Sequence, residues 1–152
     1  MLDEQDTMLF RIMTTDDIPV VLAIERQAYA FPWTEGIFRD CLRVGYCCRI
    51  LERDNVIEAY GITSIAAGES HILNICVRQP LRRQGLGRLL LSYLMDEARN
   101  AGVETMLLEV RVSNIAAIDM YQLTGFNEIG LRPNYYPAEG GKEDALIMAY
   151  TF

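Results

Sequence analysis

The segment from Arg82 to Arg88, Arg-Arg-Gln-Gly-Leu-Gly-Arg, combines two glycines with three arginines and could bind an anion. It follows the apolar run His71–Val77 and begins an amphipathic helix pattern. Glycine lets the backbone turn tightly and approach a ligand closely. The first amides of a helix lack internal partners and lie at the positive end of its dipole, so they favour a phosphate group. The segment therefore predicts a phosphate-binding turn.

Two common nucleotide-binding motifs do not fit this segment. A Walker A loop needs Gly-Lys-Ser/Thr, which is missing, and the dinucleotide fingerprint GxGxxG needs a third glycine where the chain has Leu90. An ordinary turn between a strand and a helix is the simpler interpretation of the two glycines alone. The arginines on both sides favour the anion site.

A carboxylate, a phenol and an amide follow this turn at positions that suit acid–base chemistry. Glu109 lies near the end of the apolar strand pattern 106–111, where a carboxylate is costly unless it is exposed, paired or protonated. Desolvation favours the neutral form of such a group and makes it a serviceable general base. Tyr121, in the next helix pattern, could donate a proton to a leaving thiolate. Asn114 could contact a ligand.

Each of these residues also has a structural interpretation that the sequence leaves open. Glu109 could form a salt bridge with Arg111 on the same strand face. Tyr121 could be a core residue of an amphipathic helix, and Asn114 could be a helix cap. His71 is the only histidine, and its place in a strand-like run favours a structural role.

Two aromatic segments could form the walls of a substrate cleft. Phe31-Pro32-Trp33 separates the first two helix patterns, and Asn134-Tyr135-Tyr136-Pro137 combines two aromatic rings with a rigid proline. Glu25 and Glu35 lie near the first segment and could bind a positive charge. Surface solvation is nevertheless the commoner fate of such carboxylates.

Periodicity predicts an α/β fold with a mixed sheet. In the helix expected to end near Asn100, the predicted apolar positions are Leu86, Leu89, Leu90, Tyr93, Leu94 and Ala98. The nearly continuous apolar run 105–110 predicts a central strand covered on both faces, and a turn-rich loop is expected over 132–144. The expected strands are 9–13, 46–52, 56–66, 70–77, 105–110, 126–131 and 145–150, and the expected helices are 14–28, 34–42, 86–100 and 114–123.

Composition limits the class of protein. A chain of 152 residues suggests one domain. The net charge of −7 argues against a general nucleic-acid binder, which needs a basic face, and fits a basic partner better. No apolar run reaches the ~18 residues of a membrane span, and the acidic N-terminus lacks the features of a signal peptide. We therefore expect a cytoplasmic protein without membrane contact.

The four cysteines do not show the spacing of a metal site or a redox motif. Cys47 and Cys48 are adjacent, Cys41 stands apart, and Cys76 lies within a strand-like run. Reduced, structural thiols are expected in a cytoplasmic protein, with no bound metal.

With these residues identified, the chain resembles the GCN5-related N-acetyltransferase (GNAT) superfamily. The superfamily signature is arginine or glutamine, two residues, glycine, one residue, then glycine or alanine, and it is matched by residues 82–87. The resemblance extends to the RimI group, the ribosomal-protein-alanine N-acetyltransferases. The matching stretches are Ala30–Glu35, Leu108–Arg111, Ser113-Asn114, Asn134–Pro137 and Glu143–Ala145.

The resemblance implies a fold and a cofactor, acetyl-CoA. The fold is a single GNAT domain over residues 9–152, preceded by an extension over 1–8. Its sheet is mixed and mostly antiparallel, with about four helices and a splayed strand pair that admits the acetyl-CoA arm. The residues implied to contact the acetyl-CoA arm are Ile75, Cys76 and Val77. Those implied to hold the pyrophosphate are Arg83, Gln84, Gly85, Leu86, Gly87 and Arg88, and Asn114 is implied to contact the cofactor as well.

The resemblance also implies a reaction. Glu109 accepts a proton from the substrate's α-ammonium group, the amine attacks the thioester directly, and Tyr121 protonates the departing thiolate. The implied substrate is the N-terminal alanine of the small-subunit ribosomal protein numbered eighteen, bound by a monomer without direct nucleic-acid contact. The residues implied to flank its peptide are Phe31, Trp33, Glu35, Tyr135 and Tyr136. The alternatives are a relaxed N-terminal or small-amine acetyltransferase and a non-catalytic acyl-CoA-binding module.

Overall fold

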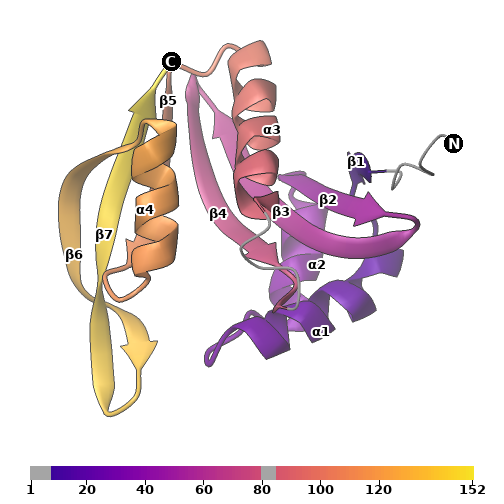
Figure 1. Cartoon of the computed structure of the whole chain (residues 1–152), viewed down its shortest axis with the longest axis horizontal. Helices are drawn as coiled ribbons and strands as arrows, with labels where there is room; N and C mark the ends of the chain where they lie inside the picture. The colour runs from indigo at the N-terminus through magenta and orange to yellow at the C-terminus, as the bar shows by residue number, and fades with distance from the viewer. Residues whose placement is uncertain (1–7, 80–84) are drawn as a thin grey trace, which may run out of the picture. The chain divides into compact units, whose positions relative to one another are not determined.

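Seven strands form one sheet in the computed structural model, which describes residues 8–79 and 85–152. The strand order is β1-β2-β3-β4-β5-β7-β6 (Figure 1). β4 and β5 pair in parallel, whereas β1 with β2, β2 with β3, β5 with β7 and β6 with β7 pair antiparallel. The predicted mixed, mostly antiparallel α/β fold with about four helices is therefore confirmed.

The bounds of the elements agree with the predicted ones to within a few residues, except at the last two strands and at the start of the first helix. The strands are β1 (Met8–Ile12), β2 (Cys47–Arg53), β3 (Val56–Ala66), β4 (Glu69–Val77), β5 (Thr105–Arg111), β6 (Asn127–Ala138) and β7 (Gly141–Thr151). The helices are a 3-10 turn, η1 (Thr15–Asp17), followed by α1 (Ile18–Ala28), α2 (Glu35–Arg43), α3 (Leu86–Asn100) and α4 (Ile115–Thr124).

The residues of this domain group into two compact units. The first consists of Met1–Thr63 with Asn74–Tyr93, and the second of Ser64–Leu73 with Leu94–Phe152. The first unit contains α1, α2, β1, β2 and the start of α3. The second contains the parallel pairing of β4 with β5, together with α4, β6 and β7. Each unit has its own buried side chains and its own candidate site residues.

The first unit is held by an aromatic core and by local caps. Phe38 of α2 is fully buried and meets Tyr60 of β3 edge-on, with ring centroids 5.8 Å apart. Thr34 caps α2, because its hydroxyl accepts from the amide of Ile37 at 3.4 Å. Asp54 and its neighbour Asn55 both have positive φ, at 51° and 66°, which is the backbone that a tight hairpin turn requires. The cap fixes the start of α2, and the turn connects β2 to β3.

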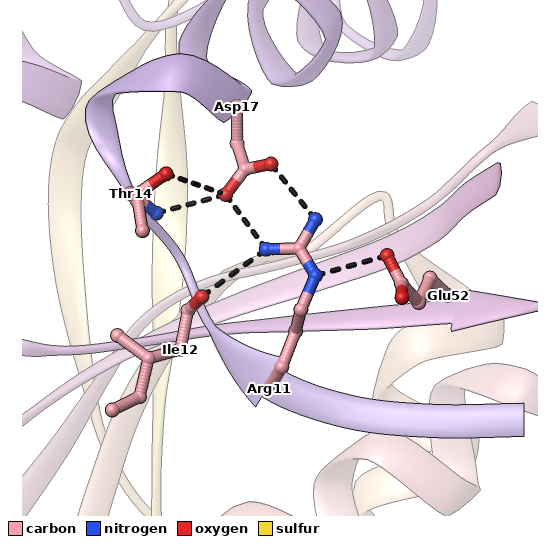
Figure 2. A network of polar contacts seen from close by, with 5 residues as sticks. All are labelled: Arg11, Ile12, Thr14, Asp17 and Glu52. Atoms are coloured by element: carbon pink, nitrogen blue, oxygen red, sulfur yellow. Dashed lines mark hydrogen bonds and ion pairs between the residues drawn. The ribbon is translucent and has the colours of Figure 1, made fainter. Parts of the chain in front are cut away.

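An ion-pair network joins β1 to the start of α1 and to β2 (Figure 2). The guanidinium of Arg11 donates to both oxygens of Asp17 at 2.8 Å and to Glu52 at 2.9 Å. The amide of Thr14 also donates to Asp17, at 2.8 Å. These bonds, chiefly those from Arg11, hold the pKa of Asp17 below its usual value. A bidentate pair of this kind fixes direction as well as distance, so it determines how the chain leaves β1.

The second unit has one well-buried sheet face at β5. Met106, Leu108 and Val110 are buried, while the alternate residues, Glu109 among them, are only partly covered. The prediction that this strand is covered on both faces is therefore wrong. Side chains of a strand alternate between faces, and the sequence concealed that alternation because Leu107, on the partly covered face, joins the buried residues into one apolar run.

The buried stripe of α3 differs from the predicted one. Leu89 was predicted to be buried but is 40% exposed, whereas Leu91 and Met95 are buried beside Leu90 and Leu94. Three consecutive leucines at 89–91 cover most of the circumference of one helical turn. The periodicity therefore allowed two stripes, and tertiary packing selected one.

The last two strands form one long hairpin in place of the predicted loop over 132–144. β6 pairs with β7 up to Ala138↔Gly141, with an irregularity between Arg132 and Tyr136. Prolines 133 and 137 suggested a loop, but β6 is the last strand in the sheet order, and an edge strand tolerates proline. Asn134, with a φ of 53°, absorbs the irregularity.

We expect the substitution Asp17→Asn to lower the free energy of unfolding by about 2 kcal/mol at pH 7, because the charge-assisted bonds from Arg11 are lost. The matched control is Asp16→Asn on the same turn, where the side chain is exposed; a change within about 0.5 kcal/mol is expected. Chemical denaturation of both variants measures the difference. Equal stability of the two would contradict the structural role of the network.

The same network predicts a pH dependence. Because the pKa of Asp17 is lowered in the folded protein, its contribution is present above the unfolded value of about 4 and is lost as the pH falls through the folded value. The difference between wild type and Asp17→Asn should therefore shrink below about pH 4. A difference that stays constant down to pH 2 would rule out the ionised pair as its origin.

Candidate active site

The predicted phosphate-binding turn falls partly on described residues. Gly85 has a φ of +77°, a backbone conformation that residues other than glycine rarely adopt. Its carbonyl accepts from the amide of Leu89 at 3.1 Å, which starts α3. The amides of Leu86, Gly87 and Arg88 therefore occupy the first turn of a helix, the position that suits an anion. Arg82, Arg83 and Gln84, also part of the predicted turn, lie outside the described residues.

The second half of β4 carries the other candidate cofactor residues of the first unit. Cys76 is 2% exposed, so its neighbours Ile75 and Val77 direct their side chains to the opposite face of the strand. The hydroxyl of Tyr29, directly after α1, donates to the carbonyl of Ile75 at 3.0 Å. This bond ties the end of α1 to the strand that was predicted to present backbone groups to the acetyl arm.

A buried carboxylate anchors the first aromatic segment. Glu25 is 2% exposed and accepts three hydrogen bonds: from the hydroxyl of Tyr60 at 2.6 Å, from the amide of Trp33 at 2.9 Å and from the side chain of Asn74 at 3.0 Å. Burial, followed by Cys76 and by this carboxylate, raises the pKa of Tyr60. The expectation of surface solvation is wrong for Glu25, which links α1, β3, β4 and the segment before α2.

The aromatic segment itself divides into an anchored and an exposed residue. Trp33 packs against Phe38, with ring centroids 5.4 Å apart, while Phe31 is 46% exposed. Glu35 is on the surface and pairs with Arg39 one turn along α2, at 2.9 Å. An exposed pair of this kind contributes little to stability. Glu35 can therefore exchange Arg39 for another cationic partner at little cost in free energy. The segment can offer one ring and one carboxylate to a ligand.

In the second unit, Glu109 is held by two partners. Its Oε2 is hydrogen bonded to Nε2 of His71, and its Oε1 lies 3.4 Å from Nε of Arg132. The parallel register places His71 beside Leu107, so His71 and Glu109, two residues further on, share one face. The side chain of Glu109 is only 10% exposed, and its burial is compensated by these partners.

These partners correct two interpretations. Glu109 was interpreted as a salt-bridge partner of Arg111, but its partners are His71 and Arg132. His71 was interpreted as structural, yet it bonds to the candidate base. The sequence partly indicated this contact, because His71 and Glu109 both lie in predicted strands. The register that brings them together is a property of the parallel pairing, which the sequence did not determine.

Arg111 instead organises the far end of β5. Its guanidinium donates to Glu143 at 3.0 Å and to the carbonyl of Pro137 at 2.8 Å, and it lies over the ring of Tyr136 at 4.5 Å. Glu143 also accepts from the amide of Ser113 at 2.9 Å. Hydrogen bonding by Ser113, then by Arg111, keeps the pKa of Glu143 below its usual value. The hairpin is thereby tied to the end of β5 and to the turn before α4.

Asn114 and Tyr121 lie at the two ends of α4. Asn114 is exposed and caps the helix, because its side-chain oxygen accepts from the amide of Ala117 at 3.3 Å; the helix-cap interpretation is confirmed. Tyr121 is 7% exposed and meets Phe126 edge-on at 5.6 Å. Burial, with a smaller effect of Tyr136, raises the pKa of Tyr121. Its phenol therefore carries a proton throughout the neutral range.

Two tyrosines of the hairpin form a second aromatic surface. Tyr135 is 48% exposed, Tyr136 is half-buried, and their rings are perpendicular at 4.9 Å. Arg132 lies over the ring of Tyr135 at 5.7 Å. Burial, together with Tyr135 and Glu109, raises the pKa of Tyr136 to about 12. This surface adjoins the candidate base, because Arg132 contacts both Tyr135 and Glu109.

Other kinds of site were searched for in the described part of the chain. Within residues 8–79 and 85–152, no group of three histidines, cysteines or carboxylates could hold a metal ion. The four cysteines are free thiols, and Cys41, Cys48 and Cys76 are buried. No helix in these ranges combines the length and the apolar character needed to cross a membrane.

The described residues include the kinds of group that acyl transfer uses. In the first unit, a helix that begins at a glycine turn suits a phosphate group. In the second unit, a nearly buried carboxylate can accept a proton, and a protonated phenol can donate one. These are the groups expected of a GNAT-type acetyltransferase.

Comparisons with known proteins agree with this class. The sequence model of the Acetyltransferase (GNAT) family matches residues 12–126, and the chain belongs to this family. A protein of Salmonella typhimurium named [ribosomal protein bS18]-alanine N-acetyltransferase is 45% identical over 138 residues, which cover 91% of this chain and 93% of the relative.

Solved structures show the same likeness. The ribosomal-protein-S18-alanine N-acetyltransferase of Escherichia coli has a TM-score of 0.90 and 42% identity, covering 95% of this chain and 94% of that chain. A putative acetyltransferase of Salmonella typhimurium, yncA, was solved with its cofactor acetyl-CoA. It has a TM-score of 0.79 and 21% identity, covering 95% of this chain and 94% of its own, so this second likeness concerns the fold alone.

Proposed function

We propose that this protein transfers the acetyl group of acetyl-CoA to the N-terminal alanine of ribosomal protein bS18. The observation that carries the proposal is the 45% identity, over 91% of the chain, to an enzyme with that name. The TM-score of 0.90 to the Escherichia coli enzyme supports it. In the proposal the enzyme is cytoplasmic, the compartment expected for a ribosomal-protein substrate.

Acetyl-CoA is the co-substrate of GNAT acetyltransferases, and residues of the first unit fit it. In the proposal, Arg83, Gln84 and the amides of 85–88 hold the pyrophosphate, because a helix start and fixed positive charge both favour an anion. The backbone of Ile75–Val77 contacts the pantetheine arm. Asn114 is also proposed to contact the cofactor, through its exposed side chain.

The proposed reaction is a direct transfer. Glu109 takes one proton from the α-ammonium group, and the free amine attacks the thioester carbon. The C–S bond then breaks, the thiolate of CoA takes the proton of Tyr121, and the new amide returns its second N–H proton to the tyrosinate. The products are the acetylated amine, CoA and the proton that Glu109 releases to water. No acyl-enzyme is formed.

The raised pKa of Tyr121 supports its proposed role. A phenol that stays protonated at neutral pH is available as a donor whenever the thiolate forms. Burial also weakens it as an acid, so the thiolate must develop close to full charge before the proton moves. This order of events suits a general acid that acts late, when the C–S bond is nearly broken.

The peptide side of the site is proposed from the aromatic residues and the charge. Phe31, Trp33 and Glu35 lie on the first unit, and Tyr135 and Tyr136 on the second. The net charge of −7 favours a basic peptide. We propose that a monomer binds the substrate's N-terminal residues through these side chains, without contacts to nucleic acid or membrane.

Peptide assays test the substrate. A synthetic peptide with the N-terminal sequence of bS18 should gain one acetyl group, seen by mass spectrometry, whereas the same peptide with a blocked N-terminus should gain none. Intact bS18 from cells that lack this protein should be lighter by one acetyl group. Equal turnover of unrelated N-termini or of a polyamine would replace the proposal by a relaxed acetyltransferase.

We expect Glu109→Gln to lower turnover by roughly 10²–10⁴, the usual range for a lost general base, with acetyl-CoA affinity unchanged in calorimetry. Glu128→Gln is the matched control, because Glu128 is an exposed glutamate of β6; its turnover should equal that of the wild type. Wild-type turnover of Glu109→Gln across pH 6–9 would remove Glu109 from the mechanism.

Tyr121→Phe should slow the chemical step by roughly 10²-fold or more, because only the proton donor is removed. The packing against Phe126 does not involve the hydroxyl, so the melting temperature should change little. Single-turnover measurements separate the chemical step from product release. A wild-type single-turnover rate would leave Tyr121 with the core role that its burial also allows.

A further inference from the structure

His71 lies beside the proposed base, Glu109, but the proposed reaction gives His71 no role. Its Nε2 is hydrogen bonded to Oε2 of Glu109 within the second unit. The side chain of His71 is 30% exposed and that of Glu109 is 10% exposed. The contact joins neighbouring parallel strands at one sheet face, where both backbones are fixed by the register. It is therefore held by the fold.

The two oxygens of Glu109 have different environments. Oε2 is hydrogen bonded to His71, whereas Oε1 is 3.4 Å from Nε of Arg132. The side chain of Arg132 is 54% exposed, so this second pair is solvated and weak. A cationic substrate group can displace a weakly held guanidinium far more readily than it can displace a hydrogen bond between two strands. Oε1 is consequently the oxygen whose partner is easier to displace.

We propose that His71 is a positioning residue for the proposed base: it fixes Oε2 of Glu109, so that Oε1 receives the substrate's proton. This inference rests on the proposed function, in which Glu109 is the base. The neutral imidazole donates its Nε2–H to Oε2, and the carboxylate stays ionised and oriented. The imidazole keeps its proton throughout, and Glu109 returns the substrate's proton to water.

The charged and titratable groups around the pair come from several strands. β6 contributes Arg132 at Oε1 and Tyr136, which interacts electrostatically with Glu109. On β5, Arg111 is bonded to Glu143, and β7 places the neutral Ile147 opposite Glu109. His71 is thus the hydrogen-bond donor that β4 contributes to this carboxylate.

Two amide substitutions test the position of the donor. The side-chain nitrogen of glutamine reaches the place of Nε2, whereas that of asparagine is one methylene shorter. His71→Gln should keep kcat within about three-fold of the wild type. His71→Asn should lower kcat roughly ten-fold, the rate equivalent of one hydrogen bond to a charged group, with an unchanged KM for acetyl-CoA.

A double-mutant cycle with Glu109→Gln separates positioning from general destabilisation. If His71 acts through Glu109, adding His71→Asn to Glu109→Gln should have no further effect on kcat. An additional ten-fold loss in the double variant would overturn the inference, as would wild-type kcat in His71→Asn. Melting temperatures of all variants confirm that each is folded.

The same measurements distinguish a failure of Glu109 as the base from a failure of His71 as its positioning residue. Wild-type turnover of Glu109→Gln alone would refute the proposed base and the positioning role with it. A large loss in Glu109→Gln, together with no effect of His71→Asn, would refute only the positioning role. Equal losses in His71→Gln and His71→Asn would show that the imidazole is needed for a reason other than its donor at Nε2, and would also overturn the inference.

Discussion

A carboxylate on a largely buried strand needs partners that compensate for its lost hydration. In the second unit, Glu109 is the carboxylate with this requirement. The parallel register of β4 with β5 supplies His71 on one side, and the edge hairpin supplies Arg132 on the other. The compensation is unequal, with one partner fixed between strands and one partner in solvent. In the proposed mechanism, that inequality leaves Oε1 to receive the substrate's proton. Stability and proposed chemistry therefore depend on the same two contacts.

The first unit meets the same requirement in a different way. Glu25 is more deeply buried than Glu109, and three donors saturate it: Tyr60, Asn74 and the backbone of Trp33. A carboxylate with this many partners is committed to structure, because moving any donor leaves a buried acceptor unpaired. Its role is to hold the aromatic segment before α2 against the sheet. The contrast explains why, of two carboxylates in apolar surroundings, Glu109 is the better candidate for proton transfer.

The hairpin of β6 and β7 connects the site to the edge of the sheet. Its irregularity between Arg132 and Tyr136 displaces the strand locally, and bulges of this kind commonly redirect side chains near active sites. Here the residues of that stretch include Arg132, which reaches Glu109, and Tyr135, which stays exposed. Arg111 and Glu143 tie the far end of the hairpin to β5. The hairpin that carries the aromatic surface is thus held in place by Arg111 and Glu143, while the ring of Tyr135 stays exposed.

The sequence by itself determined the order of the elements, the mixed sheet and the family, because these depend on local patterns and short motifs. The tertiary structure decided what depends on register and on sheet position. It selected the buried stripe of α3 from two possible ones, turned the proline-containing segment of β6 into an edge strand, and buried Glu25. It also placed His71 against Glu109. Residues separated by 38 positions meet only through the pairing of two strands, and no local pattern specifies which residues that pairing brings side by side.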